Sequence, residues 1–299
     1  MNILPKVKQV ALLCSFLGLP FLGISAESPK PWLFMADWQK RDADTVSDSS
    51  GSAGKFGRAR TGVEVIYQEA DRAYDLEWYR YAQRFTGALA GTDRSYGDTQ
   101  DLIFSGFRQW RYNDRYALQA IYGLEWAAED VVGLADGFRW GLGGAVRWQP
   151  DAETDVALGV MLQDRFENSL LPVPYVKAVW RPCRYAEVEL RATGLQNGII
   201  FRGFPTADRA TTVDLLVAYE TLNFRLSDAA YGARAVAVGE VPVRFGVTQF
   251  LEPSGTWFVR GQFEWVPFAR HSFKHAGETQ ASFQPGATWG LAGRVGARF

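Results

Sequence analysis

The chain has 299 residues, and its 32 Lys and Arg against 33 Asp and Glu give a formal net charge of −1. A nearly neutral chain lacks the basic surface that nucleic acid requires, so nucleic acid is excluded as a partner. Beyond the first 26 residues there is no run of 18 apolar residues, which excludes a helical membrane protein.

Residues 1–26 have the composition of a secretory signal peptide. Lys6 and Lys8 form a basic start, an apolar run follows, and Ala26 supplies the small residue at the cleavage site. A membrane helix is the alternative, but the apolar run is short and Pro20 interrupts it. We therefore predict an exported protein whose mature part is one domain, 27–299.

Cleavage would remove two lysines and no acidic residue, which changes the net charge from −1 to −3 (−1 − 2 = −3). It would also remove Cys14, so that Cys183 is the one cysteine left. An exported domain with one thiol has no internal disulfide and is not a small stapled scaffold.

Apolar and polar residues alternate along most of the mature chain, which predicts β-strands with one apolar face and one polar face. The clearest examples, in chain order, are 116–126, 138–148, 156–162, 186–192, 257–265 and 289–299. Strands of soluble sandwiches are usually about five or six residues long. These segments are longer and match the roughly ten residues that a tilted strand needs to cross a bilayer.

The connections between these strands are of two kinds. Short turns are predicted at 113–114, 150–153, 182–184 and 252–255. Longer loops are predicted at 91–99, 128–136, 165–172, 195–210 and 269–285, and the polar segment 40–57 is predicted to be a flexible loop. The two kinds alternate along the chain, as tight periplasmic turns and longer external loops do in outer-membrane barrels.

Counting strands backwards from the C-terminus predicts fourteen, with both chain ends in the periplasm. The fold class is therefore an all-β, up-and-down, transmembrane antiparallel β-barrel. The count depends on strands at 31–39 and 74–90 and on a tight hairpin at Gly239 and Glu240. Loss of one pair would give twelve strands.

Aromatic residues on one face of several predicted strands are eight to ten positions apart. These pairs are Tyr116 with Trp126, Trp140 with Trp148, Trp257 with Trp265, and Trp289 with Phe299. On a tilted strand this spacing corresponds to about 20–25 Å, the height of the apolar band between two aromatic girdles. A soluble core would not require such pairing.

The C-terminal segment, GATWGLAGRVGARF, ends in mid-strand on Phe299. Its alternate residues Trp289, Leu291, Val295 and Phe299 are apolar. In this the chain resembles single-chain, porin-like outer-membrane β-barrel proteins of Gram-negative bacteria, although no particular family is indicated. The resemblance implies location in the outer membrane, contact with its lipid, and reading of these four residues by the barrel assembly machinery.

Charged residues on the polar faces are expected to line the lumen, where eight acidic and eight basic residues balance. We name as lumen-facing candidates Arg139, Arg147, Lys177, Arg191, Arg234, Arg244, Arg260, Arg294, Glu187, Glu189, Asp214 and Glu264. These charges could form a ladder of ion pairs that braces the wall. They could also line a polar bore, with Arg244, Arg260 and Arg294 as one basic, hydrated wall.

The polar bore is the interpretation that we favour, because a barrel of this size has more room than side chains alone must fill. The predicted function is a porin-like passive channel for small polar solutes. A structural barrel, or an adhesion barrel acting through its external loops, is the alternative.

An enzyme is the remaining possibility, and we predict none. The chain contains two histidines, His271 and His275, both in a predicted loop, and it has no G-x-S-x-G motif. A barrel hydrolase needs a histidine near the external rim as base, and the sequence leaves open a pair of one histidine with Asp164 or Glu167, near another external rim. We predict no catalytic residue, no metal site and no cofactor.

Overall fold

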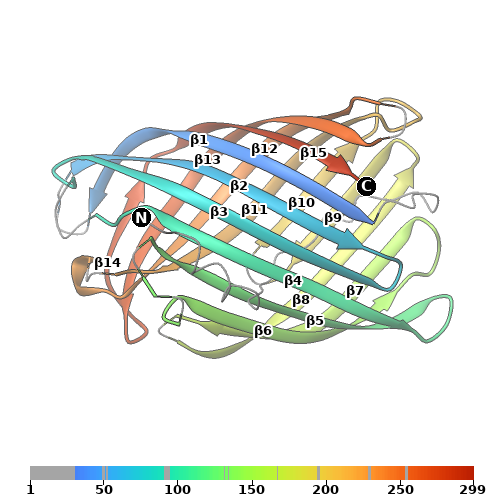
Figure 1. Ribbon diagram of the computed structural model, residues 1–299, viewed down its shortest axis with the longest axis horizontal. Helices are drawn as coiled ribbons and strands as arrows, with labels where there is room; N and C mark the ends of the chain where they lie inside the picture. The colour runs from blue at the N-terminus through green and yellow to red at the C-terminus, as the bar shows by residue number, and fades with distance from the viewer. Residues whose placement is uncertain are drawn as a thin grey trace, which may run out of the picture.

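The described residues of the computed structural model are 31–48, 51, 53–90, 95–130, 132–133, 135–166, 168–193, 196–227, 230–252 and 255–299. The predicted signal peptide lies outside them. They form a closed antiparallel β-barrel (Figure 1). No helix in this part of the chain is long and apolar enough to cross a membrane.

The described residues form fifteen strands and one short 3-10 helix. They are β1 (Trp32–Asp48), β2 (Ala53–Gln68), β3 (Arg72–Gly87), β4 (Thr99–Arg111), β5 (Tyr116–Glu129), β6 (Phe138–Trp148), β7 (Thr154–Arg165), β8 (Asn168–Cys183), β9 (Ala186–Ala192), β10 (Gln196–Gly203), β11 (Thr211–Arg225), η2 (Ala230–Gly232), β12 (Ala235–Phe250), β13 (Trp257–His275), β14 (Glu278–Pro285) and β15 (Thr288–Arg298).

The barrel closes where β15 pairs with both β13 and β1. β14 pairs with the same two strands further along, at His271 with Phe283 and at Val46 with Pro285. β14 and β15 therefore occupy one position in the wall, one after the other, with Gly286 and Ala287 between them. Fourteen strands surround the lumen, which confirms the predicted count and the antiparallel fold class.

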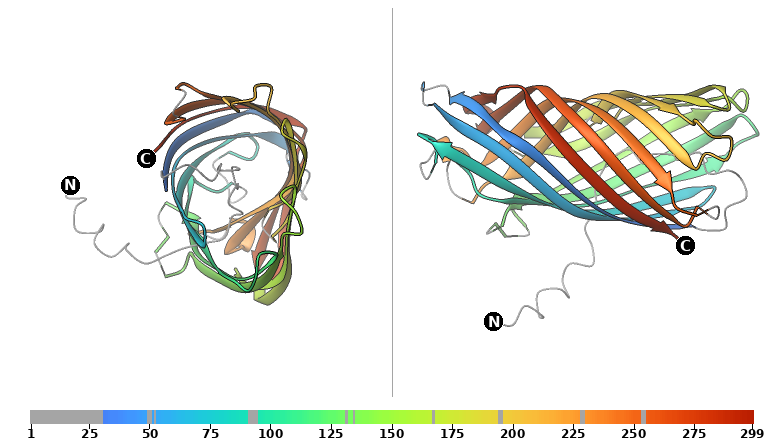
Figure 2. Two further views of the ribbon diagram at one scale, coloured as in Figure 1. Left: turned by 90° about the vertical axis from the view of Figure 1, so that its right-hand side faces the viewer. Right: turned by 90° about the horizontal axis from the view of Figure 1, so that it is seen from above.

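The two ends of the barrel differ, and we name them by what they carry. The terminal end carries Trp32 and Phe299, whose backbones exchange two hydrogen bonds of 3.0 and 2.9 Å. The loop end carries β14 and the connection from β3 to β4. Figure 1 shows the C-terminus and β14 at opposite ends, and the left view of Figure 2 looks into the barrel from the terminal end.

The strand count is right although two of its parts are wrong. The hairpin predicted at Gly239 and Glu240 does not exist, because β12 runs unbroken from Ala235 to Phe250 and pairs with β11 and β13 on both sides of this point. A register shift between Val241 and Val243 accommodates the intervening proline within the strand.

The segment 195–210, predicted to be an external loop, contains the strand that the count then lacks. β10 (Gln196–Gly203) pairs with β11 over its whole length and with β9 from Asn197 to Gly203. Gly198 allows the close approach of β11, since a Cβ atom there would lie 2.5 Å from the carbonyl oxygen of Val217. One missed strand and one surplus strand cancelled in the count.

Two other predicted loops are strand extensions at the loop end. β1 continues to Asp48 and β2 begins at Ala53, so most of 40–57 is a hairpin. β13 continues to His275, turns through Ala276 and Gly277 at φ values of 49° and 84°, and returns as β14, so 269–285 is also a hairpin. Likewise, β8 begins at Asn168, within the loop predicted at 165–172.

The outer surface of the barrel is apolar, as the alternation predicts. Large side chains that are exposed on it include Trp140, Leu142, Trp148, Leu158, Val160, Trp257, Trp265 and Trp289. Trp126 shares this outward register but is buried, because the loop after β5 covers its ring. The indole nitrogen lies 3.4 Å from the carbonyl oxygen of Gly133, and Gly137 also packs against the ring.

We expect Val160→Arg to destabilise the barrel by about 2–4 kcal/mol, the cost of a charged side chain at the middle of the lipid-facing band. Val160 lies midway along β7 and is 56% exposed. Urea unfolding in lipid vesicles measures the effect, and Glu153→Arg, at the turn before β7, is the matched control. Equal stability of the two variants would contradict the assigned band.

Candidate functional site: the barrel lumen

Inward-facing side chains divide the lumen into three layers. An aromatic cap fills the loop end, an ion-pair layer follows, and a cavity lies towards the terminal end. The layers are described in this order below, because each is built from a different part of the strands.

The aromatic cap is a cluster of buried apolar residues from strands on several sides of the lumen. It contains Val46, Phe56, Tyr79, Tyr81, Leu89, Tyr96, Ile103, Phe224, Leu226, Val236, Val238, Phe273 and Phe283. Leu89 and Tyr96 come from the connection between β3 and β4, and the other residues come from the strands and from the end of β11. The ring of Tyr96 lies 5.4 Å from that of Phe85 and 5.9 Å from that of Phe273.

The cap fits because the wall is narrower at the loop end. In the sheet, β6 to β10 separate β5 from β11, yet Arg225 of β11 pairs directly and in parallel with Ala128 of β5. Beyond this point, the backbone nitrogen and hydroxyl of Ser227 lie 2.6 and 2.7 Å from a carboxylate oxygen of Glu129. The longer strands therefore extend past the shorter ones towards the loop end and enclose a narrower lumen there. The aromatic cap fills this narrower part.

His271 belongs to this cap and not to a loop. Its Nδ1 lies 2.9 Å from the hydroxyl of Tyr96, and its ring stacks on Phe283 at 4.3 Å. It lies beyond Phe268, the last large apolar residue exposed on the outer face of β13, and hence outside the apolar band. Burial, with a smaller contribution from Arg58, lowers the pKa of His271 to about 3.

The position of His271 gives it a packing role. The helical turn that a metal-binding pair with His275 would require is absent, because β13 includes both residues. Among the described residues there is no group of three or more His, Cys, Asp or Glu side chains placed to hold a metal ion.

The ion-pair layer is centred on two buried carboxylates, Glu240 and Glu264. Arg41 donates to Glu240 at 2.6 and 3.0 Å, and Arg58 donates to it at 2.8 Å. Glu264 accepts hydrogen bonds from Arg41 and, at 2.6 Å, from Arg244. Buried charges require partners of this kind, so the network joins β1, β2, β12 and β13 across the closure of the barrel.

A second network surrounds Glu187 and Glu189 on β9. Arg202 donates to Glu187 at 2.5 Å and to Glu189 at 2.8 Å. Arg191 donates to Glu189 at 2.5 Å, and Arg181 donates to Glu187 at 2.9 Å. Each carboxylate therefore has two or more cationic neighbours.

The remaining lumen candidates are also found in ion pairs. Arg139 pairs with Glu125, Arg147 with Asp155 at 2.6 Å, and Lys177 with Glu189 at 3.6 Å. Arg234 does not belong to the set. It continues the even-numbered row of Val236 and Val238, but it precedes the first residue of β12 and is exposed at the loop end.

Arg244, Arg260 and Arg294 do not form the unpaired basic wall that the sequence suggested, because each of them pairs with acidic residues. Arg244 pairs with Glu220 and Glu264, Arg260 pairs with Asp214 at 2.6 Å, and Arg294 lies 3.2 Å from Asp37 and 3.4 Å from Glu64. The sequence identifies which residues face inward. It does not identify the acids on neighbouring strands that neutralise them.

Three important residues of these networks were missed because they lie in segments predicted to be loops or turns. They are Arg41 in 40–57, Arg202 in 195–210 and Glu240 in the supposed hairpin. The signal for Arg41 was present, since it continues the inward row that Leu33, Met35 and later odd-numbered positions of β1 begin.

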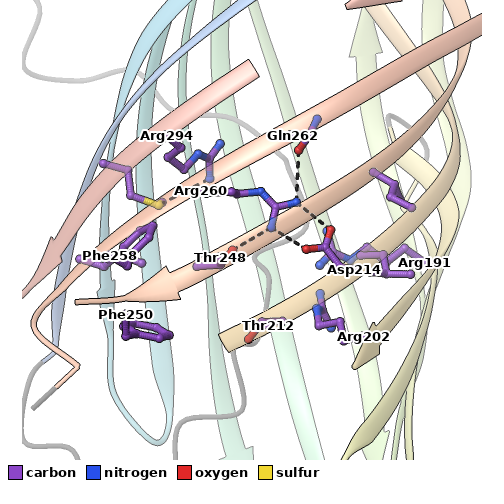
Figure 3. Close-up of a pocket in the computed structure, with 14 residues that line it drawn as sticks. Arg191, Arg202, Thr212, Asp214, Thr248, Phe250, Phe258, Arg260, Gln262 and Arg294 are labelled. Atoms are coloured by element: carbon purple, nitrogen blue, oxygen red, sulfur yellow. Dashed lines mark hydrogen bonds and ion pairs between the residues drawn. The ribbon is translucent and has the colours of Figure 1, made fainter. Parts of the chain in front are cut away.

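A cavity of about 210 Å³ lies below these networks, near the terminal end (Figure 3). We call it the lower cavity. Its polar lining consists of Arg191, Arg202, Thr212, Asp214, Thr248, Arg260, Gln262 and Arg294. Its apolar lining consists of Leu33, Met35, Ile200, Leu216, Phe250 and Phe258. Arg260 donates hydrogen bonds of 2.6 and 2.7 Å to Asp214 and one of 3.0 Å to Thr248.

The residues of the predicted assembly segment lie on the outer surface of β15 and at its end. Trp289, Leu291, Val295 and Phe299 are all exposed there. The ring of Phe299 lies 6.0 Å from that of Phe34, and Trp289 stacks on Trp265 at 5.6 Å. They form part of the apolar outer face across the seam where the barrel closes.

No family model matches the chain, and no curated protein matches it either. Among solved structures, an outer membrane channel from Pseudomonas putida F1 is 10% identical, with 95% of this chain and 100% of that chain covered and a TM-score of 0.46. The toluene transporter TbuX of Ralstonia pickettii is 9% identical, with 91% and 90% covered and a TM-score of 0.45.

The NanC porin is 7% identical, with 88% of this chain and 98% of that chain covered and a TM-score of 0.35. All of these proteins are named as outer-membrane channels, porins or transporters. The identities and TM-scores are too low to assign the chain to a family or to identify a solute.

We expect Glu264→Gln to destabilise the barrel by about 3 kcal/mol, because removing one partner of a buried ion pair costs about 3–5 kcal/mol. The lower value is expected since Arg41 and Arg244 retain Glu240 and Glu220. Urea titration of the folded barrel measures the change. Glu69→Gln, in an exposed pair with Arg72, is the control and should leave the midpoint almost unchanged. Similar midpoints for both variants would argue against the network.

We expect acidification to weaken the barrel through His271. Between its ordinary pKa of 6.5 and about 3, an unfolded chain binds a proton at this histidine and the folded chain does not. Stability is therefore lost as the pH falls below about 6.5, by about 2 kcal/mol at pH 5. Between pH 7.5 and pH 5, the unfolding free energy of the wild type should fall by about 2 kcal/mol more than that of His271→Gln. His275→Gln should behave as the wild type, and parallel pH profiles for all three would refute the assignment.

Proposed function

We propose that the protein spans the outer membrane of a Gram-negative bacterium and acts as a channel for small solutes, closed at its loop end in this conformation. The terminal end faces the periplasm, and the loop end faces outward. The apolar outer surface supports the location, because lipid requires apolar side chains on the outside of a closed barrel.

The lower cavity is the observation that carries the channel proposal. The interior of a purely structural barrel is expected to pack to high density, because unfilled volume forfeits contact energy. Here, space remains open inside the wall and is lined by charged residues. The proposed solutes therefore have a polar group, and the balance of charges in the lumen favours no strong general ion selectivity.

The aromatic cap makes this channel different from an open porin. Its rings occupy the lumen at the loop end, so we expect low conductance at rest. Leu89 and Tyr96 belong to a connection and not to the barrel wall. These two side chains of the cap could therefore be displaced while the strands remain paired, which is what a gate requires.

A structural or adhesion barrel is the second candidate, and the dense ion pairing supports it. Under either function, we propose contact with outer-membrane lipid and recognition of Trp289, Leu291, Val295 and Phe299 by the barrel assembly machinery. An enzymatic function is not part of either proposal.

We expect the double variant Leu89→Ala, Tyr96→Ala to raise single-channel conductance severalfold over the wild type in planar bilayers. Truncation of these two side chains removes part of the cap and leaves the wall intact. Tyr112→Ala is the matched control, since Tyr112 is 85% exposed in the turn between β4 and β5. It should conduct as the wild type does. Absence of conductance in all three folded proteins would reject the channel and favour the structural barrel.

A further inference from the structure

The lining of the lower cavity contains more basic than acidic residues. Arg191, Arg202, Arg260 and Arg294 line it, and Asp214 is the acidic residue among the lining residues. The other carboxylates that pair with these arginines, such as Glu187 and Glu189, are not among the lining residues. A small anion inside the cavity would therefore find more guanidinium groups than carboxylates at contact distance.

One side of the cavity carries a cluster of apolar residues, beside which Arg294 lies with its Nη1 3.5 Å from the sulfur of Met35. Leu33 and Met35 of β1 lie beside Phe258 of β13 in one buried cluster, with Phe250 of β12 packed against it. The rings of Phe250 and Phe258 are 5.7 Å apart at an angle of 55°. Figure 3 shows both rings on one side of the cavity, with Arg202 and Asp214 across from them.

We propose that the lower cavity binds a small organic anion that consists of a carboxylate on a compact apolar body. The carboxylate would lie at the arginines, and the apolar body would lie against Met35 and the two phenylalanines. The volume of about 210 Å³ is below the roughly 300–1,000 Å³ of sites for drug-sized ligands, which favours a body of one ring or a short chain. This inference rests on the proposed channel for the supply of the ligand.

Arg202 is the arginine best placed to hold the carboxylate. It lines the cavity, and a planar guanidinium matches a carboxylate with two parallel hydrogen bonds. Its own acidic partners do not depend on it alone, because Glu187 also pairs with Arg181 and Glu189 also pairs with Arg191. Arg202 can thus share a ligand without exposing a buried, unpaired carboxylate.

Isothermal titration of the full chain in a non-ionic detergent tests the chemistry of the site. The probes are benzoate and hexanoate, which carry both features, benzyl alcohol, which lacks the charge, and acetate, which lacks the apolar body. We expect saturable binding of benzoate, hexanoate or both, at least tenfold tighter than that of benzyl alcohol and acetate. Preference for benzoate over hexanoate, or the reverse, identifies a ring or a chain as the body.

Matched variants test the position. Arg202→Gln is expected to weaken binding of the preferred carboxylate about tenfold, and Met35→Gln, of similar length, is expected to weaken it severalfold. Arg181→Gln removes an arginine of the same network that does not line the cavity, so it should change the affinity less than twofold. Equal effects of Arg202→Gln and Arg181→Gln would overturn the assignment of Arg202.

The proposed binding site and the proposed channel are tested by different measurements, so one can be rejected while the other is supported. Equal affinities for all four probes, or no saturable binding, would overturn this inference even if the protein conducts ions. Saturable, Arg202-dependent binding in a protein that never conducts would support the site and reject the channel.

Discussion

Pairing of β1 with β15 is the interaction on which the rest of the structure depends. A sheet in lipid cannot leave an edge, because each unpaired backbone group costs several kcal/mol in hydrocarbon. The ladder from Leu33 with Arg298 to Arg41 with Gly290 removes the two edges at once. It also brings the first and last strands together, so Glu264 of β13 can pair with Arg41 of β1, 223 positions away in the chain.

Closure of the barrel determines which side chains face outward and which face the lumen. Within the apolar band, the outward row must consist of apolar residues, so every charged residue in that part of a strand is directed inward. The number of charges in the lumen is therefore a consequence of the outer face, and their low exposure requires pairing. The strand order then decides which acids meet which bases.

The direction of a side chain is set locally, whereas its ion-pair partner is set by strand order, and this difference explains what could be predicted from the sequence. The inward and outward rows were predicted well, since alternation is a local property of residues such as Trp140 and Leu142. The network of Glu240 could not be predicted, because its partners Arg41 and Arg58 meet it only when the barrel has closed. β10 was missed because its eight residues, bounded by polar and glycine positions, give too short a pattern.

The aromatic cap is explained by the same alternation in the parts of the strands that extend beyond the apolar band. On β13, the outward residues are apolar up to Phe268, but further along they are Arg270, Ser272 and Lys274, while His271 and Phe273 are buried inside. The pattern is inverted because water replaces lipid outside the barrel, and a protein core replaces the polar lumen inside it. A strand long enough to leave the bilayer thus builds a soluble-type core on top of a membrane barrel. The loops predicted over 40–57 and 269–285 were wrong for this reason, since the polar residues that suggested loops are the solvent face of that core.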